Sequence, residues 1–569
     1  MLELSASHLR LDDPEVHAEP VGPVYAALKR HLRGEGPAGL VILGRFGSGK
    51  TTLCEAAASA EDPSLPPCTA VPLRVVARHA SVEEGLRRVV GDVRLAEARE
   101  GRRTLLLDGL DEVAHTEVRD FPDLFAQLTA LAGPRWVLTS RPGHFRTDAS
   151  EPEPHQVDVL ERPGITLLRI DDLPLQTVRQ EIAGLRGGAR LLESVEGLEQ
   201  LSRSPLLLHV VQAAVPYIDS GRPIEPWGVF DAWVRYGLHS GPDHEEFLHA
   251  LQELAWEAFR QSGYTAESAS FLPDQVAALR LPNALRALFV RDLDGRLRFG
   301  HRSLYEYFCA AHLAPRLHAN QGQGPDELTG LRISEAMRVF LVGRVPRMPV
   351  EYHNGQVRIP RGNFVAGGDE SPDERPLRIE HLDRPFWIAR EPVTNAAWAA
   401  YLAAVPEADR VDVNYLPHWG PDRILPHLRT DEPVYGIWPE DADAYAAWKG
   451  ARLPTADEWE KAVRGIDGRR WPWGDYWKPG CAVSAETGLR RPLPVRAFGA
   501  HGDAGLFAAI GGVFEYTASA WRDRPERGRV VMGGCYTHPH TTSRASLRLS
   551  HKLSGRLKAG LRLAWDDEP

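Results

Sequence analysis

Short apolar runs alternate with helix-forming stretches over the first part of the chain. Four runs have the composition of buried β-strands: GLVIL at 39–43, PLRVV at 72–76, RTLLLDGL at 103–110 and RWVLTS at 135–140. Strands that alternate with helices in this way are typical of a parallel sheet with helices on its faces. We therefore predict an α/β core over residues 38–160, preceded by an N-terminal segment, 1–37.

The next region, 161–318, has apolar residues at intervals of three and four, which predicts helices, most clearly over 194–215 and 245–261. Near its end, LFVRDLDGRLRFGH places two strand-like runs on either side of Asp294-Gly295, a pair that favours a tight β-hairpin. Helices followed by a hairpin indicate a winged helix.

A polar stretch, ANQGQGPDELTG, begins at residue 319 and predicts a linker, 319–350, that also holds the short helix SEAMRVFLVGR. From residue 351 on, the chain is rich in Trp, Gly and Pro and has short elements with long connections. Residues 351–569 are therefore predicted to be a separate domain.

A glycine-rich sequence follows the first predicted strand. It reads GRFGSGKTT and leads into the helix-forming stretch LCEAAASA. In this setting, backbone N–H groups and the helix start bind a phosphate, the lysine neutralises phosphate charge, and the first threonine reaches Mg²⁺. The spacing predicts a nucleotide site formed by Gly44, Gly47, Ser48, Gly49, Lys50, Thr51 and Thr52.

Acidic residues and an arginine follow two later strands. Asp108 ends the apolar run of TLLLDGLDEVA, at the sheet edge where nucleotides bind, and is the expected partner of Thr51 on Mg²⁺. Asp111 or Glu112 would orient the attacking water, and Arg141, after WVLTS, would contact the γ-phosphate. The alternative for each side chain is a solvated loop residue.

Together, GRFGSGKTT, LLLDGLDEV and VLTSRP resemble the NACHT class of STAND signalling ATPases, as do LSRSPLLL around Pro205 and FGHRSLYEYFCAAHLA around His301. The resemblance implies a P-loop NTPase with helical and winged-helix regions that binds ATP or ADP with Mg²⁺. It also implies that Pro205 packs near the adenine and that His301 contacts the β-phosphate of ADP. Such proteins often carry an effector before the ATPase; only 37 residues precede the predicted core here, so the effector is expected in trans.

The C-terminal part resembles the formylglycine-generating enzyme, or sulfatase-modifying factor, domain, a variant of the α+β C-type lectin fold. The matching segments are VRIPRGNFVAGG, FWIAREPVTNAAWAAYL, ARLPTADEWEKAVRGIDGRRWPWGD, GLFAAIGGVFEYT, VVMGGCY, RASLR and AGLRLA. Within them, we predict structural roles for Arg452, Trp459, Glu460, Phe514 and Tyr516.

The resemblance implies a reaction that needs two copper-binding cysteines, and those positions fall on His538 and Ser543 within GGCYTHPHTTSRASLR. Cys535 is a single thiol outside that pair, and a serine hydroxyl is not a ligand for Cu(I). We therefore predict no formylglycine-generating activity. His538 and His540 lack further spaced ligands, so no metal site is predicted here.

A binding face is the remaining interpretation of this segment. Arg544 and Arg548 match fixed framework positions, and the residues around them resemble the changeable positions in the variable proteins of diversity-generating retroelements, which use this fold. Lys552 and Lys558 do not fit that pattern, and an unvaried pocket or a decayed enzyme is the alternative. The predicted ligand-binding residues are Tyr536, Thr537, His538, His540, Thr542, Leu547, Leu549, Ser550, His551, Gly555 and Leu557.

Composition limits the class of partner and compartment. A formal net charge of −10 argues against nonspecific nucleic-acid binding. No signal peptide or membrane-length apolar stretch is present in the sequence, so a cytoplasmic protein is expected. The 5 cysteines are scattered without a CxxC pair, which fits neither a disulfide framework nor a zinc site.

These observations favour an ATP-dependent switch, in which the lectin-like domain binds a protein or surface-glycan ligand and controls ADP/ATP exchange and oligomerisation. Bacterial conflict or defence is the expected setting. The alternatives are a formylglycine-generating oxidase regulated by an ATPase, a non-diversified ligand-binding regulator and an ATP-dependent transcriptional regulator.

Overall fold

The structure is a computed structural model of the chain, and it divides into two compact units, Met1–Phe308 and Cys309–Pro569. It describes residues 5–9, 18–44, 48–60, 62–76, 79, 81–110, 121–140, 164–185, 187–194, 198–218, 225–238, 243–261, 271–286, 288–291, 296–299, 302–374, 376–405, 419, 429–521, 525–552 and 558–567. The division between the units falls inside helix α15 (Arg302–Ala319). A multidomain chain was predicted and is confirmed.

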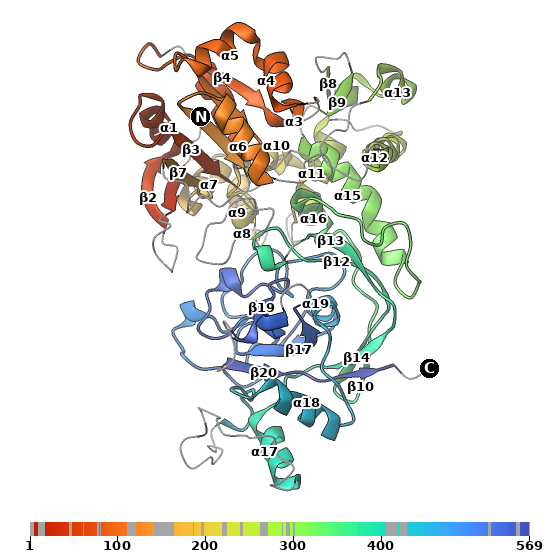
Figure 1. Ribbon diagram of the computed structural model, residues 1–569. Helices are drawn as coiled ribbons and strands as arrows, with labels where there is room; N and C mark the ends of the chain where they lie inside the picture. Colours follow the sequence, from red (N-terminus) through yellow and green to blue (C-terminus); the bar gives the residue numbers. More distant parts are fainter. Residues whose placement is uncertain are drawn as a thin grey trace. The chain divides into compact units, whose positions relative to one another are not determined.

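The first unit contains a seven-stranded sheet in the order β2-β1-β7-β3-β6-β5-β4 (Figure 1). The five strands from β7 to β4 are parallel, and β1 and β2 extend the sheet as antiparallel strands. The strands are β1 (Ser5–Leu9), β2 (Ala18–Pro23), β3 (Gly39–Leu43), β4 (Cys68–Pro72), β5 (Thr104–Asp108), β6 (Trp136–Ser140) and β7 (Ile165–Ile170). The predicted parallel sheet is therefore confirmed.

Alternate residues of the central strands face two different cores. Leu40 and Ile42 of β3 pack with helices α1 (Val24–Leu32) and α2 (Lys50–Ala58). Val41 and Leu43 point the other way, toward α4 (Val82–Val90), α5 (Asp92–Arg99) and α6 (Phe121–Leu131). Each fully buried aliphatic side chain stabilises the fold by about 1.5–3 kcal/mol, so the sheet is fixed from both faces.

Two sequence-based assignments differ from the structure. PLRVV was predicted as a strand, but β4 ends at Pro72 and the following residues form helix α3 (Leu73–Val76). Pro72 cannot donate a ladder hydrogen bond, and a strand ends there readily. The run ITLLRI is β7 and lies beside β3, although it belongs to the region predicted to be helical. Six apolar residues are too few to distinguish a strand from a buried helix by periodicity.

The rest of the first unit is mostly helical. The hairpin predicted around residues 294 and 295 is confirmed by antiparallel pairing of β8 (Phe289–Arg291) with β9 (Leu297–Phe299). The helices are α7 (Leu175–Ala183), α8 (Gly188–Ser194), α9 (Leu198–Leu201), α10 (Pro205–Ala214), α11 (Pro226–Ala232), α12 (His244–Gln261), α13 (Pro273–Ala278) and α14 (Asn283–Arg286). Within the ranges that the structure describes, no helix is long and apolar enough to cross a membrane.

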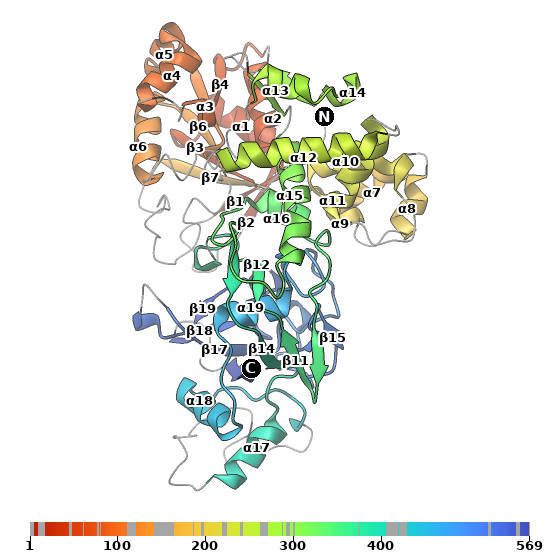
Figure 2. The same ribbon diagram turned by 90° about the vertical axis from the view of Figure 1, so that its right-hand side faces the viewer.

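The second unit contains two four-stranded sheets, in the orders β10-β11-β14-β21 and β19-β18-β17-β20 (Figure 2). The first comprises β10 (Glu351–His353), β11 (Gln356–Ile359), β14 (Phe386–Ala389) and β21 (Ala564–Asp566). The second comprises β17 (Phe514–Ala520), β18 (Arg529–Met532), β19 (Leu549–Ser550) and β20 (Ala559–Leu561). Shorter pairs join β12 (Gly362–Ala366) with β13 (Arg378–Leu382) and β15 (Ala500–His501) with β16 (Leu506–Phe507).

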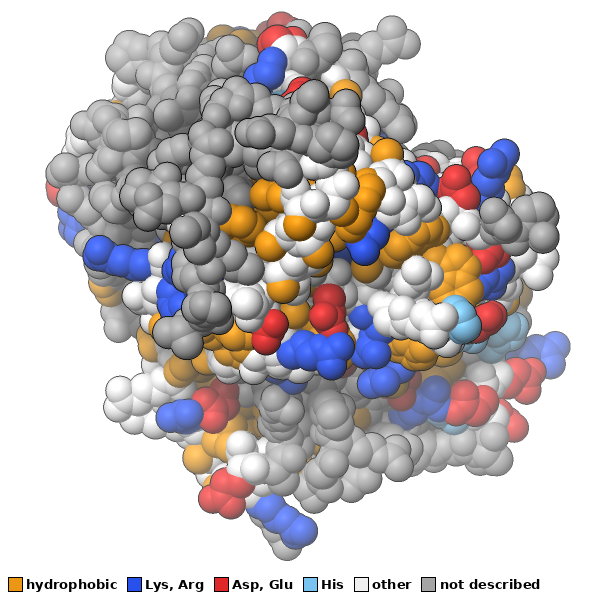
Figure 3. All heavy atoms as spheres, turned by 90° about the horizontal axis from the view of Figure 1, so that it is seen from below, with side chains coloured by type: hydrophobic (Ala, Val, Ile, Leu, Met, Phe, Trp, Pro, Cys, Tyr) orange, Lys and Arg blue, Asp and Glu red, His pale blue; other side chains and the backbone are white. Residues whose placement is uncertain are grey.

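Its helices are α16 (Glu335–Leu341), α17 (Asn395–Ala404), α18 (Pro439–Trp448) and α19 (Ala456–Arg464). Helix α19 begins with a capping box, in which Thr455 and Glu458 each bond the other's backbone N–H. Figure 3 views this unit from the end that carries α17 and α18, where hydrophobic side chains lie among charged side chains of both signs.

The segment that the sequence predicts as a linker is packed within the second unit. Asn320 donates to Asp326, which also accepts a hydrogen bond of 2.7 Å from Asn363 of β12. Arg338 of α16 is 2% exposed and bonds both oxygens of Asp475, at 2.8 and 2.7 Å. Polar hydrogen bonds and a buried ion pair therefore hold residues 320–341 against the domain.

The predicted structural residues of this domain are all in the interior or in ion pairs. Trp459, Glu460, Phe514 and Tyr516 are each at most 1% exposed. Arg452 pairs with Glu458 at 2.7 Å and fastens the start of α19.

Lys461 of α19 provides a test of the packing. Its ammonium is fully buried and donates to Pro360 O at 2.7 Å and Gly362 O at 2.9 Å. Burial lowers the pKa of Lys461 to about 7. Between this pH and the unfolded pKa of about 10.4, Lys461 is neutral in the folded protein but protonated in the unfolded chain. The free energy of unfolding therefore rises with pH over this range.

We expect the difference in unfolding free energy between wild type and Lys461→Met to grow by on the order of 2 kcal/mol in favour of wild type between pH 7 and 9. Denaturant titrations at several pH values measure it, with the exposed Lys449→Met as the matched control. A difference that does not change with pH would contradict this account.

Candidate functional site

The glycine-rich turn places a helix start at the carboxyl edge of the parallel sheet. Gly44 follows β3, and α2 begins at Lys50 directly after Gly49, whose φ of 90° is in the left-handed region that favours glycine. The Lys50 ammonium donates to Gly44 O at 2.6 Å. Thr51 and Thr52 lie on the first turn of α2 and are exposed. A helix that starts close behind a parallel strand offers backbone N–H groups to a phosphate.

Ser48 lies inside this turn with its hydroxyl buried and without a hydrogen-bond partner. A Cβ at Gly44 would come within 2.3 Å of the Ser48 hydroxyl oxygen, so any other residue there would make this hydroxyl shift. The Ser140 hydroxyl, at the end of β6, is also buried and unpartnered, and its carbonyl accepts a bond of 3.0 Å from Gly44 N–H. An unsatisfied buried hydroxyl costs about 1–3 kcal/mol, which a bound polar ligand would offset.

Asp108 ends β5 at the same sheet edge, and β6 lies between β5 and β3. Its carboxylate is 6% exposed and accepts a hydrogen bond of 2.6 Å from Thr139 of β6. The charges of both Asp108 and Lys50 affect the pKa of the buried Cys54 thiol on α2. Burial raises the pKa of Cys54, and the Asp108 carboxylate raises it further, whereas the Lys50 ammonium opposes this. Lys50 and Asp108 therefore act on the same small region of the sheet.

The structure describes only one of the other six residues that the sequence predicts at the nucleotide site. Gly47, Asp111, Glu112, Arg141 and His301 lie outside the described residues. Pro205 is the first residue of α10, where a proline is favoured, and is partly buried.

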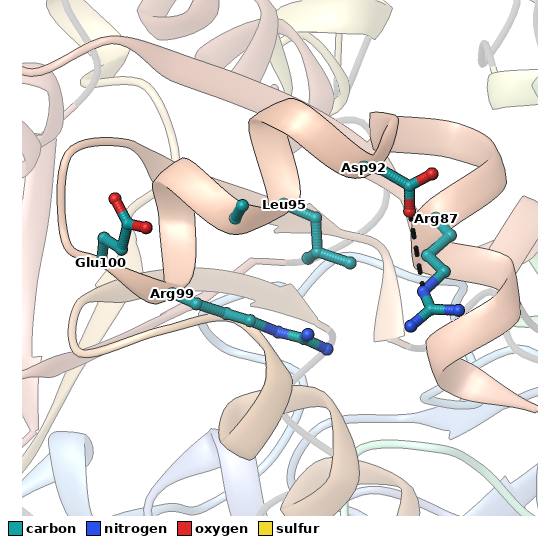
Figure 4. A pocket seen from close by; sticks show the side chains of 6 residues that line it. Arg87, Asp92, Leu95, Arg99 and Glu100 are labelled. Atoms are coloured by element: carbon teal, nitrogen blue, oxygen red, sulfur yellow. Dashed lines mark ion pairs between the residues drawn. The ribbon is translucent and has the colours of Figure 1, made fainter.

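A separate hollow of about 200 Å³ lies between α4 and α5 (Figure 4). Its charged side chains compensate one another, since Arg87 lies 3.7 Å from Asp92 and 3.2 Å from Glu83. This hollow therefore offers no unbalanced charge for a ligand. Its lining residues are Arg87, Asp92, Leu95, Ala96, Arg99 and Glu100.

In the second unit, two arginines fix the segment 533–548 near the C-terminus; Arg544 is buried and Arg548 is partly buried. Arg544 contacts both Glu374 and Glu370, and Arg548 bonds Glu460 at 2.6 Å. Burial alone would lower the pKa of Arg544, but the carboxylates of Glu374 and Glu370 raise it. Both arginines are therefore structural.

Cys535 is fully buried and lies beside a histidine. The Cys535 Sγ atom is 3.0 Å from His538 Nδ1 and 3.3 Å from Thr537 Oγ1. Burial raises the pKa of Cys535 and lowers the pKa of His538, so a neutral thiol and a neutral imidazole are favoured. Ser543, at the second expected cysteine position, is buried and donates to Pro539 O at 3.2 Å.

These side chains do not fit a copper centre. Within GGCYTHPHTTSRASLR, Cys535 is the one thiol and the second expected cysteine position holds the Ser543 hydroxyl. The described part of the chain contains no group of three or more possible metal-ligating side chains. Soft Cu(I) prefers thiolate ligands, which a single high-pKa thiol supplies poorly.

The predicted ligand face divides into surface and interior positions. Tyr536, Thr537, His538, His540, Thr542 and Leu549 are exposed or partly exposed, whereas Gly555 and Leu557 lie outside the described residues. Leu547, Ser550 and His551 are only 6%, 3% and 8% exposed, so these three predicted positions lie in the interior in this structure. Ser550 donates to Arg527 O at 2.6 Å, and His551 accepts from Arg529 N–H at 2.9 Å, so both hold neighbouring backbone.

Sequence reasoning missed an aromatic and acidic group beside His540. The Trp477 ring lies 5.3 Å from the His540 ring, and His540 Nδ1 is 2.7 Å from Glu486. Burial alone would raise the pKa of Glu486, but hydrogen bonds, including those from the His540 ring and backbone N–H, lower it to about 2. The run WPWGDYW was the only signal available for these rings.

Comparison with known families matches a model described as "Sulfatase-modifying factor enzyme 1-like domain" to residues 342–567. The formylglycine-generating enzyme of Thermomonospora curvata is 33% identical over 228 residues, which cover 31% of this chain and 74% of that enzyme. The chain belongs to the sulfatase-modifying factor enzyme 1-like family. The predicted formylglycine-generating-enzyme-like C-terminal domain is thereby confirmed.

Other family relatives differ in the names they carry. A hercynine oxygenase of Mycolicibacterium smegmatis is 33% identical over 266 residues, covering 37% of this chain and 61% of that protein. A bovine protein named inactive C-alpha-formylglycine-generating enzyme 2 is 30% identical over 240 residues, covering 33% of this chain and 79% of that protein. The chain spans only 61% and 57% of the first two hercynine oxygenases that it matches.

Among solved structures, PvdO from Pseudomonas aeruginosa is 22% identical with a TM-score of 0.32, covering 39% of this chain and 99% of that one.

The burial of Cys535 gives a direct test of this part of the family domain. Because Cys535 is fully buried with a raised pKa, we expect it to react with iodoacetamide more slowly than the partly exposed Cys481 in the native protein at pH 8. Mass spectrometry of timed samples measures both rates, with the denatured protein as the control. Rapid modification of native Cys535 would show instead an accessible, activated thiol.

Proposed function

We propose that this protein is a nucleotide-dependent switch: the first unit binds ATP or ADP with Mg²⁺, and the second unit binds a ligand without oxidising it. One observation carries the nucleotide assignment. Lys50, the unpartnered Ser48 hydroxyl and Asp108 lie together at the carboxyl edge of a parallel sheet, beside the start of α2. Each of these groups has a partner in a phosphate or a magnesium ion.

In this proposal, Lys50 neutralises phosphate charge, and Thr51 and Asp108 hold Mg²⁺, which would stabilise charge on the transferred phosphoryl group. The proposal retains the roles that the NACHT-type resemblance implies: water orientation by Asp111 or Glu112, γ-phosphate contact by Arg141, adenine packing by Pro205, and retention of ADP by His301. Slow hydrolysis would return the switch to its resting state.

Control by the second unit requires that its ligand prefer one nucleotide state, because a ligand that binds both states equally shifts nothing. The proposed ligand is a protein or a surface glycan at the exposed Thr537 and the partly exposed Tyr536, His540 and Thr542. The only covalent connection between the units runs through α15. An effector in trans and oligomerisation of the activated protein complete the proposal.

The second candidate is a formylglycine-generating oxidase, which the names of several family relatives favour. It would have to act through Cys535 and a partner other than the expected cysteine. Copper-dependent oxygen uptake with a cysteine-containing peptide, lost in Cys535→Ser, would establish it in place of ligand binding.

Lys50→Ala tests the nucleotide assignment. It is expected to weaken ATP binding by at least about 10- to 150-fold, because one charge-assisted hydrogen bond worth about 1.5–3 kcal/mol is lost and the phosphate charge stays unpaired. Calorimetric titration of the full chain with ATP and Mg²⁺ measures it. Lys29→Ala is the matched control, because Lys29 is a lysine of α1 in the same unit and forms an ion pair with Asp62 instead of a nucleotide contact. Equal ATP affinity in Lys50→Ala and wild type would remove Lys50 from a nucleotide site.

Sequencing of codons 530–569 across a population of the source organism tests diversification. We expect substitutions at the exposed or partly exposed positions Tyr536, Thr537, His540 and Thr542 and none at the buried Leu547 and Ser550, which the fold needs. An invariant segment would mean a fixed ligand and would contradict diversification.

A further inference from the structure

Thr139 connects the two strands that form the candidate nucleotide site. It is the next-to-last residue of β6 and is fully buried. Its hydroxyl donates to Asp108 Oδ1 at 2.6 Å and accepts from the Gly109 backbone N–H at 2.9 Å. One hydroxyl therefore fixes both the carboxylate at the end of β5 and the peptide that follows it.

Strand register explains why these groups meet. Leu107 of β5 pairs with Leu138 of β6, so Asp108 and Thr139 occupy the next position along the two parallel strands and share a face. That face is the one covered by α2, since Ile42 and Val137 pack with α2 and Cys54 of α2 experiences the Asp108 charge. Thr139 thus lies on the nucleotide side of the sheet.

We propose that Thr139 is a positioning residue that orients the Asp108 carboxylate for Mg²⁺ bound with a nucleotide. The inference rests on the proposed function. A hydroxyl can donate one hydrogen bond, and Thr139 donates it to Oδ1 of Asp108. This bond favours one orientation of the carboxylate about the Cα–Cβ and Cβ–Cγ bonds of Asp108. A short O–H···O bond to a carboxylate is among the stronger hydrogen bonds, and such partners of metal ligands tune metal affinity.

A purely structural role for Thr139 makes a different prediction. In that role, the side chain only fills space and supports the fold, and valine, with nearly the same shape, would lose one hydrogen bond to Asp108. Loss of the hydroxyl would then weaken the fold and nucleotide binding equally with and without metal. Positioning of Asp108 instead confines the effect to the Mg²⁺ dependence.

The experiment uses the full-length chain and a fluorescent ADP analogue, titrated in EDTA and at increasing Mg²⁺. For Thr139→Val we expect unchanged affinity in EDTA and an about 10- to 100-fold higher Mg²⁺ concentration for half-maximal enhancement of binding. Thr139→Ser keeps the hydroxyl and is expected to restore the wild-type Mg²⁺ dependence. Thr104→Val, a buried threonine at the opposite end of β5, is the matched control and is expected to match wild type.

Equal Mg²⁺ dependence in Thr139→Val and wild type would overturn the proposal, as would a Thr139→Ser variant as impaired as Thr139→Val. A loss of ADP binding in EDTA by Thr139→Val would assign a structural role instead. Should Thr139→Val not fold, Thr139→Ala removes the same hydroxyl and is compared in the same way. Failure of the proposed function is distinguishable, because wild type itself would then bind no ADP.

Discussion

The parallel alignment of β3, β6 and β5 is the constraint on which the chemistry of the first unit depends. Parallel strands end at one edge of a sheet, so Gly44, Ser140 and Asp108 come together although they are far apart in the sequence. Gly44 N–H bonds Ser140 O, and Thr139 bonds Asp108, so this edge is cross-linked by hydrogen bonds. The start of α2 then supplies backbone N–H groups and Lys50 at the same place.

The second unit depends on a different interaction, the pairing of charges in its interior. Arg562 and Glu515 are both fully buried and bond each other at 2.7 Å, and Trp459 donates to the same carboxylate. Removing one partner of such a pair strongly destabilises a fold, because the other charge stays buried and unpaired. Arg544 and Arg548 hold the C-terminal segment in the same way. The buried ion pairs that stabilise this unit therefore do not involve the more exposed side chains between Tyr536 and Thr542.

Local pattern was sufficient to predict some of this structure from the sequence. Buried strands such as 104–108 and 136–140 are continuous apolar runs, and the glycine-rich turn has its own spacing. Pairing between distant segments was not predictable. β7 was missed because a six-residue apolar run has no distinctive period, and Ser550 was placed on the surface because its pairing with Val530 of β18 leaves no local signal. Thr139 and Glu486 were missed for the same reason: their partners lie 31 and 54 residues away.

Whether the first unit binds an adenine nucleotide is measured by the nucleotide content of the purified full-length protein. Acid denaturation followed by chromatography identifies any retained nucleotide, and equilibrium dialysis with ATP and Mg²⁺ measures binding if none is retained. We expect stoichiometric ADP or ATP in one of these two measurements. A protein that neither retains nor binds an adenine nucleotide would contradict the nucleotide assignment and would leave the second unit's family as the only guide to function.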